Sequence, residues 1–151
     1  RLLSEVERIN KEAMEHIVSK AKRLLKNNIE DKTVGILGLS FKPDTDDIRD
    51  APSIIVINQL QKMGAKIKAY DSIAVKNAKE IIKHINYCKD PYEVAQGADI
   101  LIIMTEWNEF RQLDLQKIRH LMKKPILLDG RNIYDPLKMK QLGFIYQGVG
   151  R

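Results

Sequence analysis

Short, almost wholly apolar segments alternate with amphipathic segments along most of this sequence. The clearest apolar runs are KTVGILGL at 32–39, DILIIMT at 99–105 and PILLDG at 125–130. A strand takes this near-continuous apolar form when its sheet is covered on both faces. Helices between such strands require right-handed crossovers, so the strands run mostly parallel. The pattern predicts an α/β fold with a doubly wound parallel sheet.

Weaker segments complete the alternation. Further strands are expected at 66–71, 85–88 and 144–150, and helices at 75–83, 91–97, 114–122 and 135–143. The first crossover helix is expected to be capped by Asp50, with Pro52 in its first turn and Gly64 closing it. The result is a Rossmann-like sheet of about six strands, in the order 3-2-1-4-5-6.

A long amphipathic helix precedes the sheet, because apolar residues recur at spacings of three and four from Leu2 to Leu24. About 28 residues of helix would extend ~42 Å, more than a small domain requires. We therefore divide the chain into a linker or dimerisation helix, 1–29, and a binding domain, 30–151. The stripe expected to self-associate includes Val6, Ile9, Ala13 and Ile17. A helix lying wholly on its own sheet is the alternative.

Composition narrows the class of protein. The 151 residues suit one domain, and no apolar run approaches the ~20 residues that span a bilayer. The single cysteine indicates a reducing, cytoplasmic setting. The net charge of +6 comes from scattered lysines, which disfavours nucleic acid and suits an anionic small molecule. Because the chain starts at Arg1 without a methionine, we expect it to be part of a longer protein.

Candidate binding residues follow three neighbouring strands. Phe41 and Lys42 follow the first, Glu106 and Trp107 the fourth, and Arg131 the fifth. Ligands of open parallel sheets bind beyond the carboxyl ends of the strands, at the switch point. Cations for phosphate and planar groups for a base or ribose suit a nucleoside diphosphate. A solvated Lys42 and an ordinary ion pair of Arg131 are the alternatives.

Evidence for other chemistry is weaker. The G-x-G-x-x-G fingerprint is absent, and Asp71 lies much farther from Gly38 than the fingerprint's about 20 residues. We therefore expect Asp71 to serve a turn or a helix cap. The loop aspartates 44, 46 and 47 lack a supporting histidine or glutamate, so no metal site is predicted. Cys88 is expected to be a buried thiol and the three histidines surface residues, which leaves no visible nucleophile or general base.

Longer motifs resemble a known family. LGLSFKPDTDDIRDAPS at 37–53, YDS at 70–72, ADILIIMTEWNEF at 98–110, LLDGRNIYDP at 127–136 and GFIYQGVGR at 143–151 are similar to the C-terminal domain of the UDP-glucose and GDP-mannose dehydrogenases. The opening LLSEVERIN is similar to the start of that family's central helical segment. The resemblance covers essentially the whole chain. It implies a UDP-binding domain with part of a central dimerisation helix, in a homodimer.

The resemblance also implies roles for individual residues. Lys42 and Arg131 would contact the UDP-sugar, with Phe41, Glu106 and Trp107 lining the same region; a mainly structural role is the alternative for Trp107. Arg49 would reach NAD bound by the N-terminal domain; its alternative is an ion pair with Asp46 or Asp47.

The implied enzyme is an NAD-dependent nucleotide-sugar dehydrogenase that oxidises the sugar C6 alcohol to a carboxylate. Its catalytic cysteine lies in a GGSC-type motif that is absent here, so Cys88 does not take that role and this chain alone is expected to be inactive. Which sugar is bound stays open among glucose, N-acetylglucosamine and N-acetylmannosamine. A stand-alone nucleotide-sugar-binding or dimerisation module is the alternative function, and an NAD-binding domain is disfavoured.

Overall fold

A six-stranded parallel sheet forms the centre of the domain. The computed structural model describes residues 2–49 and 51–150, with side chains from residue 11 onward. The strands are β1 (Thr33–Leu37), β2 (Lys66–Tyr70), β3 (Asn86–Tyr87), β4 (Ile100–Ile103), β5 (Ile126–Asp129) and β6 (Ile145–Gly148). Their order is β3-β2-β1-β4-β5-β6, with every neighbouring pair parallel. The predicted α/β class and strand order are confirmed.

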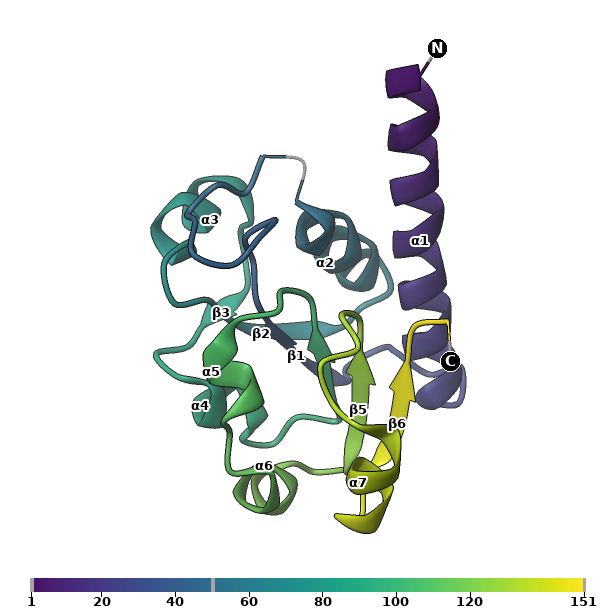
Figure 1. Cartoon of the computed structure of the whole chain (residues 1–151), viewed down its shortest axis with the longest axis vertical. Helices are drawn as coiled ribbons and strands as arrows, with labels where there is room; N and C mark the ends of the chain where they lie inside the picture. The colour runs from purple at the N-terminus through teal and green to yellow at the C-terminus, as the bar shows by residue number, and fades with distance from the viewer. Residues whose placement is uncertain (1, 50, 151) are drawn as a thin grey trace.

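Helices cover both faces of this sheet (Figure 1). They are α1 (Leu2–Leu24), α2 (Pro52–Lys62), α3 (Val75–Ile81), α4 (Pro91–Ala95), α5 (Asn108–Arg111), α6 (Leu115–Leu121) and α7 (Pro136–Gln141). Side chains of Asp90, Asp114 and Asp135 each accept a backbone N–H three residues on, which starts α4, α6 and α7. The single turn of α5 was not predicted, because four residues carry no helical periodicity.

The first crossover helix begins as its proline predicts. Pro52 occupies the first turn of α2, where its missing N–H costs nothing. The predicted capping residue, Asp50, lies outside the described residues, and Ala51 before the helix makes no side-chain cap. Gly64 has a φ of +91° at the end of the helix, a conformation that suits glycine and that matches its predicted closing role.

The sheet has an apolar core on each face because both sides of its strands are apolar. Ile36, Ile102 and Leu128 belong to the core that includes residues of α1, α2 and α3. Leu37 and Ile103, their neighbours in sequence, belong to the core that includes residues of α4, α6 and α7. Successive side chains of a strand point to opposite faces, so a continuous apolar run supplies both cores.

Helix α1 packs against α2 through its C-terminal part, while its N-terminal part projects beyond the rest of the domain (Figure 1). Ile17 is only 3% exposed and lies in the chain's own core, together with Val18 and Ala21. The prediction that Ile17 belongs to a self-associating stripe is therefore wrong, because α2 and the sheet already cover it. Ala13 is exposed. None of the described helices is both long and apolar enough to cross a membrane.

Candidate functional site

The carboxylate of Asp71, directly after β2, organises the loop that follows β1. Its Oδ2 accepts the backbone N–H groups of Leu39 and Ser40, at 2.8 and 3.0 Å. Its Oδ1 accepts those of Ile73 and Ala74, both at 2.9 Å. One side chain thus fixes both the loop after β1 and the turn before α3. The predicted turn role of Asp71 is confirmed, but its hold on the β1 loop was not foreseen.

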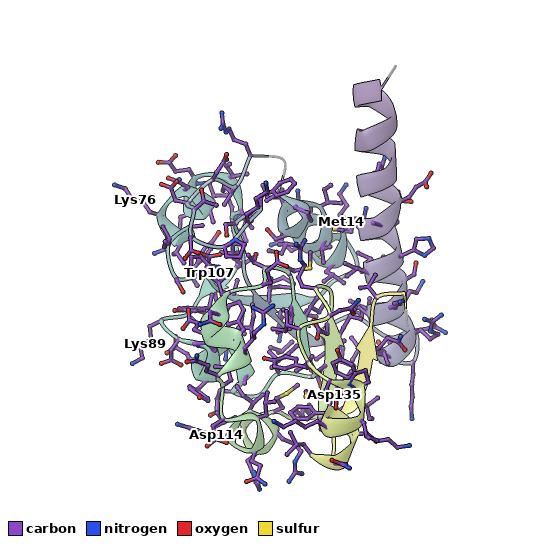
Figure 2. All side chains as sticks on the ribbon, viewed as in Figure 1. Met14, Lys76, Lys89, Trp107, Asp114 and Asp135 are labelled. Carbon is purple, nitrogen blue, oxygen red and sulfur yellow. The ribbon has the colours of Figure 1, made fainter. Side chains whose placement is uncertain are left out.

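Trp107, in the segment that follows β4, also hydrogen-bonds to the carboxylate of Asp71. Its indole Nε1–H donates to Oδ2 of Asp71 across 3.1 Å. Trp107 is 7% exposed and lies inside the body of the domain, whereas Asp114 lies at its outer surface (Figure 2). Trp107 was predicted to line the substrate region; the structure places most of its side chain in the core and leaves little of it at the surface.

Burial by itself raises the pKa of Asp71, since the charged form loses water. The four backbone N–H donors outweigh that effect and hold the pKa below its usual value. Asp71 is 3% exposed, so it is a buried carboxylate that stays ionised because it is fully hydrogen-bonded. It has no free oxygen facing solvent for a ribose hydroxyl.

Two further hydroxyls hold the backbone of the β1 loop. Thr105 Oγ1 donates to the carbonyl of Ser40, and Ser53 Oγ to that of Leu39, both at 2.7 Å. Gly38 has a φ of +99°, and a Cβ there would lie 2.5 Å from Thr105. This glycine therefore permits the close approach of the two strand ends that the hydroxyl contacts require.

The exposed part of the loop carries the predicted ligand-binding residues. Phe41 and Lys42 are exposed, beside a shallow depression of about 410 Å³ that Arg49 also lines. Arg49 donates from Nε and NH2 to the two carboxylate oxygens of Asp47, at 3.1 and 3.0 Å. These donations lower the pKa of Asp47 to about 2. The ion pair foreseen as the alternative for Arg49 is thus present, although 85% of the Arg49 side chain stays exposed.

The loop after β5 carries Arg131 and is held by a second buried carboxylate. Asp129 is fully buried and accepts the backbone N–H groups of Arg131 and Tyr134, at 3.2 and 3.0 Å. The hydroxyl of Tyr146 donates to it at 2.7 Å. The guanidinium of Arg131 pairs with Glu106 at 2.5 Å, each side chain being about one-third exposed. The ion pair that the sequence analysis gave as the alternative for Arg131 is therefore also observed.

The structure brings the predicted residues to one edge of the sheet. Because β4 pairs with both β1 and β5, the loops that carry Lys42, Glu106 and Arg131 leave three adjacent strands. Glu106 and Arg131 touch directly, while Lys42 lies on the neighbouring loop. Sequence reasoning missed the holding roles of Asp71 and Asp129. The available signal was an aspartate at the end of each of two predicted strands, 66–71 and 125–130.

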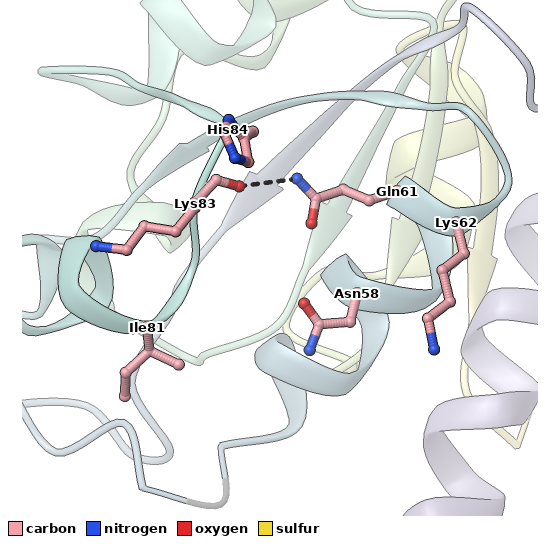
Figure 3. A pocket seen from close by; sticks show the side chains of 6 residues that line it. All are labelled: Asn58, Gln61, Lys62, Ile81, Lys83 and His84. Carbon is pink, nitrogen blue, oxygen red and sulfur yellow. Dashed lines mark hydrogen bonds between the residues drawn. The ribbon is translucent and has the colours of Figure 1, made fainter.

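Other candidate features lie elsewhere. A depression of about 520 Å³ lies between the ends of α2 and α3, lined by Asn58, Gln61, Lys62, Ile81, Lys83 and His84 (Figure 3). Gln61 donates to the Lys83 carbonyl across it, at 3.0 Å. Both helices end just before the next strand begins, so the depression lies near the edge of the sheet at which the strands start, the amino edge.

The cysteine and the histidines lie as predicted. Burial raises the pKa of Cys88 to about 11, as expected of an inert core thiol, and the three histidines are exposed.

The residues at the carboxyl edge of β1, β4 and β5 do not fit NAD. Dinucleotide folds hold the pyrophosphate on a glycine-rich turn and the ribose on an acid after the second strand. Here the β1 loop carries Phe41 and Lys42 in place of that turn, and the acid after the second strand, Asp71, is buried and occupied by backbone donors.

Fold and candidate site together define a Rossmann-like domain that presents cations, in place of a glycine-rich turn, at the carboxyl edge of its sheet. The chain belongs to the UDP-glucose/GDP-mannose dehydrogenase family and corresponds to its UDP-binding domain, to which residues 35–136 match.

Relatives agree with this assignment. The chain is 45% identical, over 82% of its length, to UDP-glucose 6-dehydrogenase of Rhizobium meliloti (strain 1021). It is 40% identical, over its full length, to UDP-glucose 6-dehydrogenase of Pseudomonas aeruginosa. A UDP-glucose dehydrogenase from the hyperthermophilic archaeon Pyrobaculum islandicum superimposes on 93% of it with a TM-score of 0.79 and 27% identity. The chain spans only 28%, 35% and 30% of these three proteins.

Proposed function

We propose that this chain binds the UDP portion of a nucleotide sugar at the carboxyl edge of β1, β4 and β5. The observation that carries the proposal is the family match over residues 35–136, which includes both cation-bearing loops. Held by Asp71 and Asp129, these loops present Lys42 and Arg131 at the ends of β1 and β5, the two strands that flank β4. Charge-assisted bonds to a diphosphate suit such a pair of cations.

Three further residues would support nucleotide binding by Lys42 and Arg131. Phe41 is 38% exposed, so its ring is available to pack against a base or ribose. Glu106 orients Arg131 through their ion pair. Trp107 acts from inside, through its bond to Asp71.

The complete protein is, in this proposal, an NAD-dependent nucleotide-sugar 6-dehydrogenase, UDP-glucose 6-dehydrogenase-like, that oxidises the C6 alcohol to a carboxylate. NAD supplies the hydride acceptor when bound. An N-terminal domain outside this chain would hold it and provide the catalytic cysteine, since the carboxyl edge of the sheet in this chain does not fit NAD. Arg49, with most of its side chain in solvent, extends toward that cofactor. The chain alone would bind but not oxidise, and the complete enzyme would work in the cytoplasm.

Calorimetry on the 151-residue chain tests the proposal. UDP should bind weakly, and NAD should not bind at the same site. In an NMR titration, UDP should shift the amides around Lys42, Glu106 and Arg131. Shifts confined to the amino edge, near Gln61 and Lys83, would overturn the assignment.

The proposed division into a dimerisation helix, 1–29, and a binding domain, 30–151, has its own test. The projecting part of α1 would pair with a second copy, with Ala13 at its exposed face. Sedimentation should show a dimer that Ala13→Glu weakens. A monomer at high concentration would contradict the dimer.

A further inference from the structure

We propose that Asp71 is a positioning residue for nucleotide binding: it sets the Phe41–Lys42 loop in its binding geometry before the ligand arrives. This inference rests on the proposed function, and it concerns a residue that touches no ligand. Its basis is the convergence of three separate segments on one buried carboxylate.

The first step is the geometry of the donors. Four backbone N–H groups divide evenly between the two oxygens of Asp71: Leu39 and Ser40 on Oδ2, Ile73 and Ala74 on Oδ1. A carboxylate has acceptor positions on both oxygens and no hydrogen to donate. An asparagine at this place would turn an NH2 group toward one of the two N–H pairs. No rotation of the amide could satisfy both pairs.

The second step is the reach of the contact along the chain. The donors on Oδ2 come immediately before Phe41 and Lys42. The Ser40 hydroxyl then donates to the Lys42 carbonyl at 2.8 Å, which continues the constraint to the proposed ligand contact. Thr105 holds the same Ser40 from its carbonyl side. The backbone that carries Lys42 is thus fixed from both sides.

The third step is the link to β4. Trp107 donates its indole N–H to the same Oδ2, and Glu106, which pairs with Arg131, is the adjacent residue. Asp71 therefore connects the Lys42 loop with the segment that contacts Arg131. Preset geometry of this kind lowers the ordering cost of binding.

Asp99 supplies a matched control at the opposite edge of the sheet. It is 4% exposed, close to the 3% of Asp71, and accepts one backbone N–H, that of Thr33, at 2.9 Å. Because Asp99 precedes β4, it is remote from the loops that follow the strands. Asp71→Asn and Asp99→Asn each replace one buried carboxylate by an amide.

The test uses the folded 151-residue chain well below its unfolding temperature. Asp71→Asn should weaken UDP binding at least about tenfold, as expected when a binding group is displaced by a fraction of an ångström to 1 Å. Asp99→Asn should leave the Kd within about twofold. Because Trp107 is the single tryptophan, its one indole N–H resonance should move in Asp71→Asn and stay in place in Asp99→Asn. An unchanged Kd in folded Asp71→Asn would overturn the proposal, and Asp71 would then serve stability alone.

Two further measurements test the positioning role if Asp71→Asn does not fold or if the wild-type chain does not bind UDP. If Asp71→Asn does not fold, Trp107→Phe removes the indole N–H donor and part of the buried ring volume while keeping an aromatic side chain in the core. The folded variant should bind UDP severalfold more weakly, and an unchanged Kd counts against the proposal. If the wild-type chain does not bind UDP, the proposed function fails, but hydrogen exchange in the free chain still tests positioning. The amides of Leu39 and Ser40 should exchange at least about tenfold faster in Asp71→Asn than in Asp99→Asn. Equal rates would overturn the positioning role.

Discussion

The guanidinium of Arg131 and the carboxylate of Glu106 form an ion pair across 2.5 Å, at the ends of the adjacent strands β5 and β4. Each side chain is about one-third exposed, so solvent screens the attraction and the pair by itself adds little to stability. Its significance is that the proposed phosphate-binding cation is already held in place at the sheet edge.

Arg131→Ala should weaken UDP binding by roughly ten- to a hundredfold, the value of one charge-assisted bond of about 1.5–3 kcal/mol. Glu106→Gln keeps the shape and removes only the charge, so the change in Kd should stay within about threefold. Calorimetry on both variants gives the comparison. A loss in Glu106→Gln as large as that in Arg131→Ala would show that Glu106 contacts the ligand itself.

Lys42→Ala should also weaken UDP binding by roughly ten- to a hundredfold, with little change in thermal stability because Lys42 is exposed. Lys123→Ala is the control: this exposed lysine lies just before β5, at the amino edge. It removes the same charge from the whole protein without touching the site. Similar losses in both variants would mean that only net charge, and not a local contact, attracts UDP.

Arg49→Ala separates a cofactor role from a structural one. In the complete protein of the proposed function, the apparent affinity for NAD should fall while UDP affinity stays nearly unchanged. The Arg49–Asp47 pair is largely exposed, so its loss should lower stability only slightly. Steady-state kinetics with NAD varied, together with UDP calorimetry, measure both effects. An equal loss for both ligands would assign Arg49 to ordering the loop alone.

Gly130→Ala should destabilise the fold by ~1–3 kcal/mol, because its Cβ would lie 2.5 Å from the Ile103 carbonyl oxygen. Gly97→Ala is the contrast, since that site has open space and only an unfavourable φ of +73°; the expected cost is ~1 kcal/mol. Denaturant unfolding gives both values. Only Gly130→Ala should also weaken UDP binding, because Arg131 follows directly. Intact UDP affinity in that variant would contradict the dependence on this turn.

The lowered pKa of Asp71 predicts a pH dependence of stability. A group whose folded pKa lies below its unfolded value of 3.8 stabilises the fold above that value. The contribution is lost as pH falls through the folded pKa. Between about pH 5 and pH 2, the unfolding midpoint of the wild type should therefore fall more steeply than that of Asp71→Asn. Parallel curves would show that Asp71 does not contribute in this range.

The local pattern of the sequence is sufficient to predict the class of fold and the sheet edge that carries the candidate residues. The apolar runs at 32–39, 99–105 and 125–130 predicted buried strands. Helical segments between the strands predicted right-handed crossovers and a parallel sheet. The expected strand order then placed Lys42 and Arg131 on loops from the two strands that flank the fourth strand. These conclusions follow from local periodicity, which the sequence carries directly.

Tertiary structure alone decided which polar groups meet. Asp71 bonds to Leu39 and Trp107 because parallel strands bring distant segments together at one edge, and no local spacing encodes that contact. The pairing of Arg131 with Glu106 depends in the same way on the register of β4 and β5. The burial of Ile17 in the chain's own core has a similar reason. The apolar stripe of a helix shows which face of the helix is buried. Only the packing of the whole domain decides whether that face packs on the same chain or on a second copy.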